Sequence, residues 1–137
     1  MQWYECNLVE FIDDLKQKDK NISSEIIFRI IAQLLIALEK LHSKNIVHRD
    51  IKSLNILIRK IGPKPTDLQV SLGDFGLGKK NEKTDKMTYI SFNGTPSYMA
   101  PELVMWDIDK ITNQLRRSQI CKIDVWAIGV VFYELLF

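Results

Sequence analysis

The sequence predicts an α+β fold that is mainly helical and carries one small β-hairpin. Two apolar stretches with helical spacing, residues 24–41 and 121–137, lie on either side of two short alternating stretches, residues 54–58 and 68–72. Recurrence at i, i+3 and i+4 is typical of a helix with one buried face, whereas alternation is typical of a half-buried strand. A polar loop, residues 48–55, joins the first helix to the first strand, and we expect chemistry there.

A short extended segment and then a small helix are predicted at the start of the chain. From position 8 onward the apolar residues recur at near-helical spacing, which indicates a helix with one buried face. This helix is expected to end within residues 16–21. Its apolar positions are Leu8, Phe11, Ile12 and Leu15.

A longer helix is predicted to begin at Ser23 or Ser24, since either serine is a good N-cap. Glu25 falls in the first turn, where a carboxylate interacts favourably with the helix macrodipole. One face of the helix is apolar and is therefore expected in the core, with His42 solvated at its end. The apolar positions are Ile27, Ile31, Leu34, Leu35, Leu38 and Leu41.

The two alternating stretches predict a β-hairpin, because the glycine and prolines of residues 62–65 break regular structure between them. A hairpin brings the outer ends of its strands together, so Asn55 and Asp74 are expected side by side. Mg²⁺ typically takes one or two carboxylates and completes its shell with phosphate and water. We therefore expect that these two oxygen-bearing residues can hold Mg²⁺ together. The apolar strand positions are Leu54, Ile56, Ile58, Leu68, Val70 and Leu72.

The rest of the chain predicts a long loop, a polar connection and a final helix. Residues 77–93 are polar and show no sustained period, and a loop of this length is usually functional or disordered. Residues 104–123 form a connection that is charged in its middle. From Cys121 onward the chain is apolar again, which predicts a buried helix. Its marker positions are Val125, Ile128, Phe132, Leu135 and Leu136.

The polar loop, residues 48–55, brings three kinds of chemistry within eight residues. Asp50 is a candidate general base, since a base must reach the hydroxyl proton that it accepts. Lys52 would neutralise a nearby anion, and Asn55 offers an uncharged oxygen ligand for a hard cation. The same residue types also fit a solvated turn after a helix, so residues elsewhere must decide between the two interpretations.

Two further motifs follow in order, Asp74-Phe75-Gly76 and the stretch GTPSYMAPE at residues 94–102. With residues 48–55, HRDIKSLN, they resemble the D-F-G, A-P-E and catalytic-loop signatures of the eukaryotic protein kinase family, with Ile51 in place of the usual leucine. The resemblance covers nearly all of residues 1–137, as a partial protein kinase domain from the hinge to the central helix of the larger lobe. It implies a mainly helical C-terminal lobe without the N-terminal lobe.

Several residues resemble the serine/threonine type of this family. Lys52 lies two residues after Asp50, and Thr95 lies in the segment that contacts the acceptor residue of a protein substrate. Ser53 replaces the proline of many members, and with Gly73 it favours the tyrosine-kinase-like group of serine/threonine kinases. The implied reaction is transfer of the γ-phosphoryl group of ATP to a Ser or Thr hydroxyl of a protein.

The resemblance also implies roles for the site residues. Asp50 would orient the nucleophile and Lys52 would steady the phosphoryl group, while Asn55 and Asp74 would hold Mg²⁺. The hinge would pair with adenine and a leucine would form the floor of its pocket. An ordinary strand-to-helix connection and a plain core leucine fit the same positions. These ATP-binding positions are Met1, Gln2, Tyr4 and Leu57.

The resemblance implies regulation as well. Phe75 would pack against His48 and switch the site on or off. In the loop that would be the activation loop, Thr84, Thr88, Tyr89 and Ser91 could all be phosphorylated, and Ser91 matches the most usual site of the family. Its phosphate would pair with Arg49 through charge-assisted bonds. Asp124 would hydrogen-bond the backbone of the catalytic loop. A core phenylalanine and a solvated serine are the alternatives for Phe75 and Ser91. Asp124 could also be an ordinary helix cap, and both of its roles can hold together.

Composition excludes several other classes. With 46% hydrophobic and 26% charged residues and a net charge of +2, the chain gives no reason to expect nucleic acid or a membrane surface as a partner. Cys6 and Cys121 form no disulfide framework, so a reducing, cytoplasmic compartment is expected. The start lacks the features of a signal peptide. The apolar run over residues 125–133 is far shorter than the roughly 20 residues of a membrane span.

The 137 residues contain no Gly-rich phosphate loop and no V-A-I-K lysine, both of which kinase chemistry requires. Three hypotheses follow: a fragment of an active kinase, a non-catalytic partner-binding module, or a truncated piece that does not fold alone. Intact Asp50, Asn55 and Asp74 argue against the second hypothesis. Apolar residues at both ends of the chain, Met1 and Phe137, favour the third.

Overall fold

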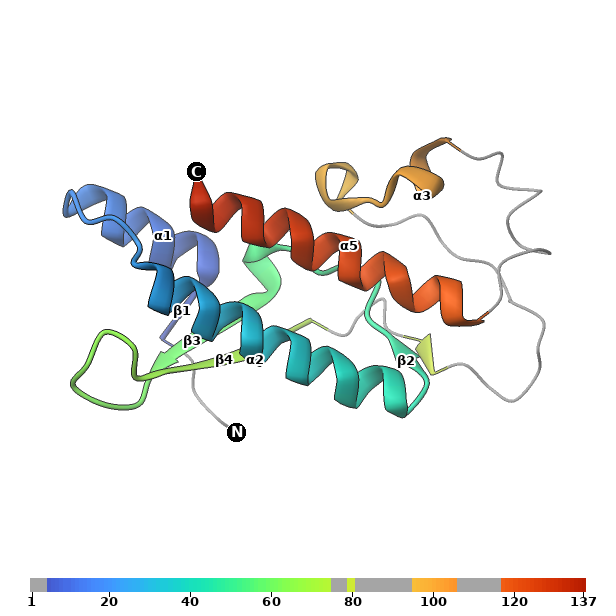
Figure 1. The fold of residues 1–137 in the computed structure, drawn as a ribbon, viewed down its shortest axis with the longest axis horizontal. Helices are drawn as coiled ribbons and strands as arrows, with labels where there is room; N and C mark the ends of the chain where they lie inside the picture. The colour runs from blue at the N-terminus through green and yellow to red at the C-terminus, as the bar shows by residue number, and fades with distance from the viewer. Residues whose placement is uncertain (1–4, 75–78, 81–94, 106–116) are drawn as a thin grey trace.

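The computed structural model describes residues 5–74, 79–80, 95–105 and 117–137. Two long helices, α2 and α5, pack against each other above a small antiparallel sheet (Figure 1). The helices are α1 (Leu8–Gln17), α2 (Ser24–Ser43), α3 (Pro101–Met105) and α5 (Arg117–Leu136), with the 3₁₀ turns η1 (Ser53–Asn55) and η3 (Pro96–Tyr98). The strands are β1 (Cys6–Asn7), β2 (Ile46–Val47), β3 (Ile56–Lys60), β4 (Leu68–Leu72) and β5 (Lys79–Lys80).

The predicted hairpin is present as β3 and β4, which pair antiparallel with Ile56 opposite Leu72. Strand β1 pairs with the other edge of β3, so the sheet has the order β1-β3-β4. A second pairing joins β2 to β5. The prediction of an unbroken loop over residues 77–93 is therefore wrong at residues 79–80, because β2 gives that segment a partner that its own sequence does not reveal.

Both N-terminal helices begin at the capping residues that their sequences supply. Asn7 caps α1 by accepting from the backbone nitrogen of Glu10, while the Glu10 carboxylate accepts from the backbone nitrogen of Asn7. This reciprocal pair satisfies two N–H groups that have no partner inside the helix. Ser23 caps α2 through the backbone nitrogen of Ile26, and Glu25 lies in the first turn, as predicted.

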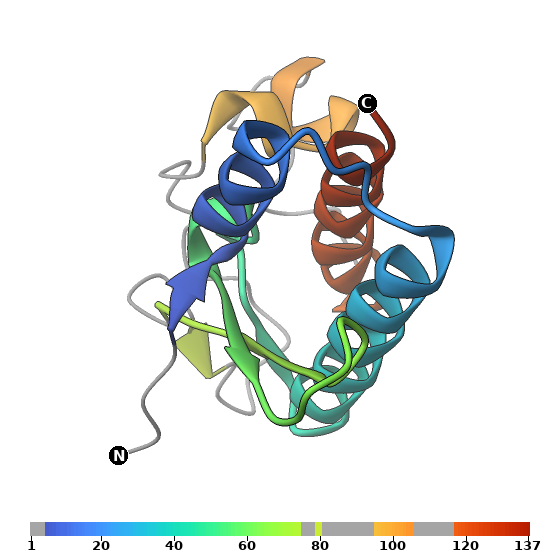
Figure 2. The same ribbon diagram turned by 90° about the vertical axis from the view of Figure 1, so that its left-hand side faces the viewer.

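The core lies between the helices and the β3–β4 hairpin. In Figure 2, α1, α5 and α2 form an arc that faces these two strands. The apolar side chains that fill the space come from all of these elements, and close packing of this kind is what fixes their relative positions. The fully buried members of the core are Leu8, Ile30, Leu34, Ile51, Ile56, Ile58 and Val131.

Four residues predicted in the core by periodicity are exposed instead. Leu35 on α2 is 46% exposed, and Val125 and Leu136 on α5 are each 50% exposed. Leu54 is 57% exposed because β3 begins only at Ile56, and Leu54 lies in the turn η1. The buried apolar residues of α5 are Ile123, Ala127, Ile128, Val131 and Leu135, and of these Ile128 and Leu135 were predicted.

Helix α5 begins at Arg117, earlier than the apolar pattern predicts. The predicted connection over residues 104–123 therefore contains helical residues at both ends, since α3 also reaches Met105. Asp124 lies inside α5, so it does not cap the helix. Within the described part of the chain, each helix falls short of the length and apolarity needed to cross a membrane.

Gln33 of α2 hydrogen-bonds the backbone of β4, the edge strand of the hairpin. The Gln33 side-chain nitrogen donates to the backbone oxygen of Leu68 at 3.0 Å, and its side-chain oxygen accepts from the backbone nitrogen of Val70 at 3.0 Å. An amide side chain has both a donor and an acceptor, so it matches the two backbone groups that an edge strand turns outward. This contact fixes the hairpin against α2.

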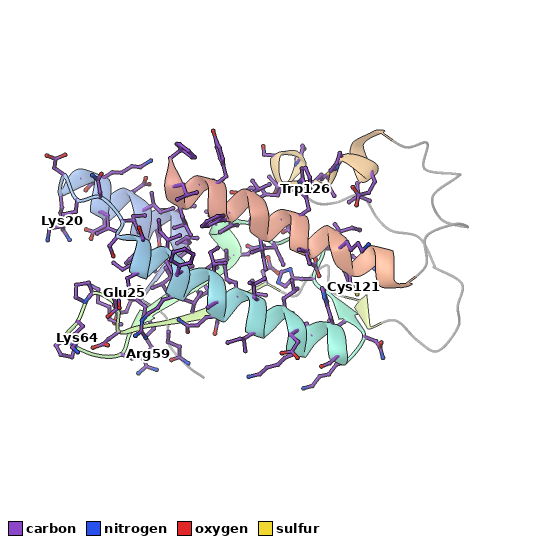
Figure 3. The ribbon with its side chains drawn as sticks, in the orientation of Figure 1. Lys20, Glu25, Arg59, Lys64, Cys121 and Trp126 are labelled. Atoms are coloured by element: carbon purple, nitrogen blue, oxygen red, sulfur yellow. The ribbon has the colours of Figure 1, made fainter. Side chains whose placement is uncertain are left out.

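Charged side chains mark the outer boundary of the molecule. Arg59 and Lys64 on the hairpin, and Lys20 before α2, lie at the periphery in Figure 3. Trp126 lies on the surface of α5 and is 47% exposed. The polar side chains that are buried lie instead in residues 48–55 and at Asp124, where they need internal hydrogen bonds.

Candidate active site

Asp124 anchors the polar loop to α5. Its Oδ2 accepts from the backbone nitrogen of His48 at 2.9 Å, and its Oδ1 accepts from that of Arg49 at 2.9 Å. The carboxylate is only 1% exposed, so these bonds replace the water that it loses on burial. The structure thus shows the backbone contact that the resemblance implies, whereas the second expected role, a helix cap, is wrong because Asp124 lies inside α5.

His42 joins the same carboxylate. Its Nε2 lies 2.8 Å from Asp124 Oδ2, and its side chain is 18% exposed. The prediction of a solvated histidine is wrong, because the end of α2 lies beside α5 and the ring reaches across to it. Both histidines of the chain, His42 and His48, therefore contact the anchor, one by its side chain and one by its backbone.

The Asp50 carboxylate is oriented by two neighbours on the same loop. Lys52 Nζ lies 2.9 Å from Asp50 Oδ2, and Asn55 Nδ2 donates to Oδ2 at 3.0 Å and to the Asp50 backbone oxygen at 2.8 Å. Both side-chain contacts use one carboxylate oxygen. The other, Oδ1, is buried and has no hydrogen-bond partner among the described residues. A buried carboxylate oxygen normally has a hydrogen-bond donor, so this unsatisfied acceptor would bind strongly any donor that reached it.

Lys52 also ties the loop to a distant segment. Its ammonium donates to Thr95 Oγ1 at 3.1 Å, across 43 residues of sequence. Thr95 immediately precedes the turn η3, so this contact brings the described part of the predicted substrate segment against Asp50 and Lys52. The predicted catalytic lysine and the predicted substrate-contacting threonine therefore meet at one point.

The hairpin brings Asp74 to the same region. The backbone nitrogen of Gly73 donates to the backbone oxygen of Asn55 at 2.7 Å, so Asp74 follows directly on a residue bonded to Asn55. His48 Nε2 lies 3.0 Å from the Gly73 backbone oxygen, which links this end of the hairpin to the polar loop. Asp74 is exposed there. The expected proximity of Asn55 and Asp74 is present.

Gly73 has little free space beside its α-carbon, and its own backbone conformation does not require a glycine. The left-handed backbone belongs to Asp74 itself, with φ of 51°, and Gly73 has an ordinary φ. A β-carbon on Gly73 would lie 3.0 Å from Leu57 Cδ1, so the glycine allows close approach of β3 and β4. Asp74 carries the conformation that non-glycine residues rarely adopt, which is typical of functional positions.

Arg49 has a backbone φ of 70°, so the loop is left-handed here as well. Its Nε and Nη1 are buried and have no hydrogen-bond partner among the described residues. Burial lowers the pKa of the guanidinium from its ordinary value, and the nearby Asp124 carboxylate partly opposes this shift. An arginine pairs strongly with carboxylate or phosphate oxygens, so these open donors suit an anion.

Five predicted site residues lie outside the described residues, namely Met1, Gln2, Tyr4, Phe75 and Ser91. Leu57 lies on β3, partly buried, opposite Asn7 of β1 and against Gly73. The donor set suits Mg²⁺ in part, because Asn55 turns its nitrogen to Asp50, which leaves its amide oxygen as the atom for a cation. Within the described residues, no group of three or more His, Cys, Asp or Glu is placed to hold a metal.

Sequence reasoning did not single out two residues near the site, Glu134 and Tyr98. Glu134 of α5 accepts hydrogen bonds from the hydroxyls of Ser53 and of Tyr98. Ser53 stood out in the sequence as a departure from the usual proline, but Glu134 lies 81 residues away. No short-range pattern indicates that such a pair will meet.

Comparison with known proteins identifies the class. The chain matches the family described as protein kinase domain over residues 4–137. It is 38% identical over 95% of its length to the serine/threonine-protein kinase pakH of Dictyostelium discoideum, and 32% identical over 98% to the sporulation protein kinase mde3 of Schizosaccharomyces pombe. It is also 43% identical over 76% of its length to the putative serine/threonine-protein kinase B of Trypanosoma brucei brucei.

The fold is therefore that of part of a protein kinase domain, with a loop of charged residues at the end of its hairpin. The chain belongs to the protein kinase family, and it corresponds to part of the kinase domain. It spans 22% of the length of the first two relatives and 21% of the third.

Proposed function

We propose that residues 1–137 form the hinge and part of the C-terminal lobe of a serine/threonine protein kinase that acts in the cytoplasm. The complete enzyme transfers the γ-phosphoryl group of ATP to a Ser or Thr hydroxyl of a protein. The observation that carries this proposal is the buried, unpartnered Oδ1 of Asp50, considered within the described residues, next to an ammonium that also contacts Thr95.

The residues around this oxygen support distinct roles. Asp50 Oδ1 accepts the hydrogen bond of the substrate hydroxyl and orients its oxygen for attack. The Lys52 ammonium lies beside the point of attack and balances negative charge on the phosphoryl group in the transition state. Thr95 fixes the position of Lys52 and borders the place where the acceptor residue binds.

The nucleotide would be held by residues on the hairpin side of the loop. When bound, Mg²⁺ neutralises charge on the phosphates, and the Asn55 amide oxygen and the Asp74 carboxylate are the oxygen ligands that this chain offers it. Leu57, which packs against Gly73 beneath these two residues, suits the floor of an adenine pocket. Met1, Gln2 and Tyr4 would complete the pocket as the hinge.

Arg49 supports a proposal for regulation. Its buried nitrogens, open among the described residues, suit a phosphate, which would add close to two negative charges. Ser91 is the proposed site of that phosphate. Phosphorylation would then fix the activation segment against the catalytic loop, whose backbone Asp124 already holds in place.

The first prediction tests the chemistry in the full-length protein. Asp50→Asn should lower the turnover number about a thousandfold, because an amide is a poor proton acceptor. Asp74→Ala should abolish Mg²⁺-dependent ATP turnover at all Mg²⁺ concentrations. The measurement is transfer of labelled phosphate from ATP to a generic Ser/Thr protein substrate. Asp13→Asn, on the exposed face of α1, is the matched control and should retain full activity.

The outcomes separate the kinase from a non-catalytic relative. Loss of activity in Asp50→Asn and Asp74→Ala with unchanged Asp13→Asn supports the phosphotransferase. Full activity in Asp50→Asn would contradict the proposed role of Oδ1. A wild-type protein without any turnover would favour a partner-binding module that keeps the fold alone.

A further inference from the structure

Three segments meet at the carboxylate of Glu134. Ser53 Oγ donates to Glu134 Oε2, and Tyr98 Oη donates to Glu134 Oε1 at 2.6 Å. Ser53 comes from the catalytic loop, Tyr98 from η3 and Glu134 from the last turn of α5. Both oxygens of one carboxylate are thus used to join the catalytic loop to the segment that follows Thr95.

The burial of these groups makes the contact strong. Ser53 is 2% exposed, and Tyr98 and Glu134 are half-buried. Burial raises the pKa of the Tyr98 phenol above its ordinary value, and the hydrogen bond to Glu134 contributes to the rise, so the phenol remains a donor at neutral pH. Hydrogen bonds to an ionised acceptor are shorter and stronger than neutral ones.

The link from Ser53 through Glu134 to Tyr98, here called the carboxylate bridge, joins the same two segments as a contact inside the site. Ser53 directly follows Lys52, and Tyr98 lies three residues after Thr95. Lys52 Nζ donates to Thr95 Oγ1 at 3.1 Å. The two links therefore connect the same two segments, one through the catalytic ammonium and one through Glu134. Any change in the outer link alters the spacing at which Lys52 meets Thr95.

We propose that Ser53 is a positioning residue that acts, through Glu134 and Tyr98, on the placement of Lys52. This inference rests on the proposed phosphotransferase function. The hydroxyl has no direct role in the chemistry, and it holds the loop at the distance from η3 at which Lys52 reaches both Asp50 and Thr95.

The test uses the full-length protein with two hydroxyl deletions. Ser53→Ala and Tyr98→Phe should each lower the turnover number about tenfold, because small misplacements of a catalytic group are costly. The KM for ATP should stay unchanged, since neither Ser53 nor Tyr98 is among the proposed nucleotide contacts. The double variant should be no worse than the more impaired single variant, because both hydroxyls act through one carboxylate. Ser53→Thr keeps a hydroxyl and should restore most of the turnover.

Two controls remove the same atoms elsewhere. Ser43→Ala deletes a serine hydroxyl at the end of α2, where it bonds only the backbone of Lys40 among its described contacts, and Tyr133→Phe deletes a phenol on the exposed face of α5. Both should leave turnover unchanged. Glu134→Gln tests the same bridge without truncating it and should resemble Ser53→Ala.

Each outcome decides the inference. Additive losses in the double variant, or an unchanged turnover in Ser53→Ala, would overturn the bridge while leaving the phosphotransferase intact. A rise in the KM for ATP in place of the loss in turnover would assign Ser53 to nucleotide binding and would also overturn it. A wild-type protein without activity would remove the proposed function, and the inference with it.

Discussion

At the scale of single residues, Asp124 is the clearest case of a side chain that organises a site without taking part in it. Its two oxygens bind two consecutive backbone N–H groups of the polar loop and the His42 ring. These bonds hold the backbone that leads into Arg49, whose φ of 70° is unfavourable for a residue with a side chain. The loop geometry therefore depends on a residue of α5.

This dependence predicts a large loss of stability for Asp124→Ala. Two buried N–H groups would lose their partners, and each unsatisfied buried group costs about 1–3 kcal/mol. The free energy of unfolding should fall by about 3–5 kcal/mol, measured by urea unfolding of the full-length protein. Asp124→Asn keeps one acceptor oxygen, so its free energy of unfolding should fall by roughly half as much. A loss below about 1 kcal/mol in Asp124→Ala would contradict the anchoring role.

The sequence motifs indicated which residues form the site, but they did not indicate which distant residues hydrogen-bond to them. Asp50, Lys52 and Thr95 could be chosen from short patterns, and the structure brings these three together. The contact of Ser53 with Glu134 could not be chosen, because it depends on how α5 packs against the loop. Only tertiary structure decides which of several carboxylates on the final helix reaches a given hydroxyl.

At the scale of secondary-structure elements, the end of the hairpin has no room for a side chain at Gly73. Gly73→Ala would place a β-carbon 3.0 Å from Leu57 Cδ1 and 3.4 Å from the Asn55 backbone oxygen. The added atom should lower the free energy of unfolding by about 1–2 kcal/mol through overpacking. It should also weaken ATP binding if Leu57 forms the pocket floor. Urea unfolding and ATP titration of the full-length protein measure the two effects.

A second glycine provides the matched control. Gly129 lies in the middle of α5, and a β-carbon added there would meet nothing within 4 Å, so Gly129→Ala adds the same atom without a clash. Because alanine favours the helix, this variant should be more stable by about 0.5–1 kcal/mol. If Gly129→Ala were less stable than the wild type, the lower free energy of unfolding of Gly73→Ala could not be attributed to a clash at the hairpin.

Elements with strong local signals were predictable and short ones were not. Ser23 and Glu25 indicated the start of α2, and residues 62–65 indicated the turn of the hairpin. The strands β2 and β5 have two residues each, which is too short for a period of two to show, whereas β1 and α1 lie where a short extended segment and a small helix were predicted. The first residues of α5 are polar, so the apolar pattern begins several residues after the helix does.

At the scale of the whole molecule, the described lobe provides only one side of a nucleotide site. The residues proposed to act on the phosphoryl group come from the polar loop and η1, the end of β4 and the segment before η3. Kinase chemistry also requires a Gly-rich loop and a lysine on the opposite side of the nucleotide, and the 137 residues contain neither.

Residues 1–137 in isolation should therefore show no measurable phosphotransfer, whereas the full-length protein should. The assay is the same transfer of labelled phosphate, carried out with both proteins at equal concentration. Large apolar side chains near the end of the chain are exposed, among them Tyr133 at 63% and Phe137 at 81%, so the isolated piece should also self-associate in light scattering. Turnover by the isolated piece that Asp50→Asn abolishes would refute this prediction.

The contact of Gln33 with the hairpin has a consequence for association between chains. Strand β4 forms an edge of the described sheet, and an uncovered edge is a template on which a strand from another chain can add. Gln33 occupies the backbone groups of Leu68 and Val70 that such a strand would use. One amide side chain thus blocks the addition of a further strand at these two positions.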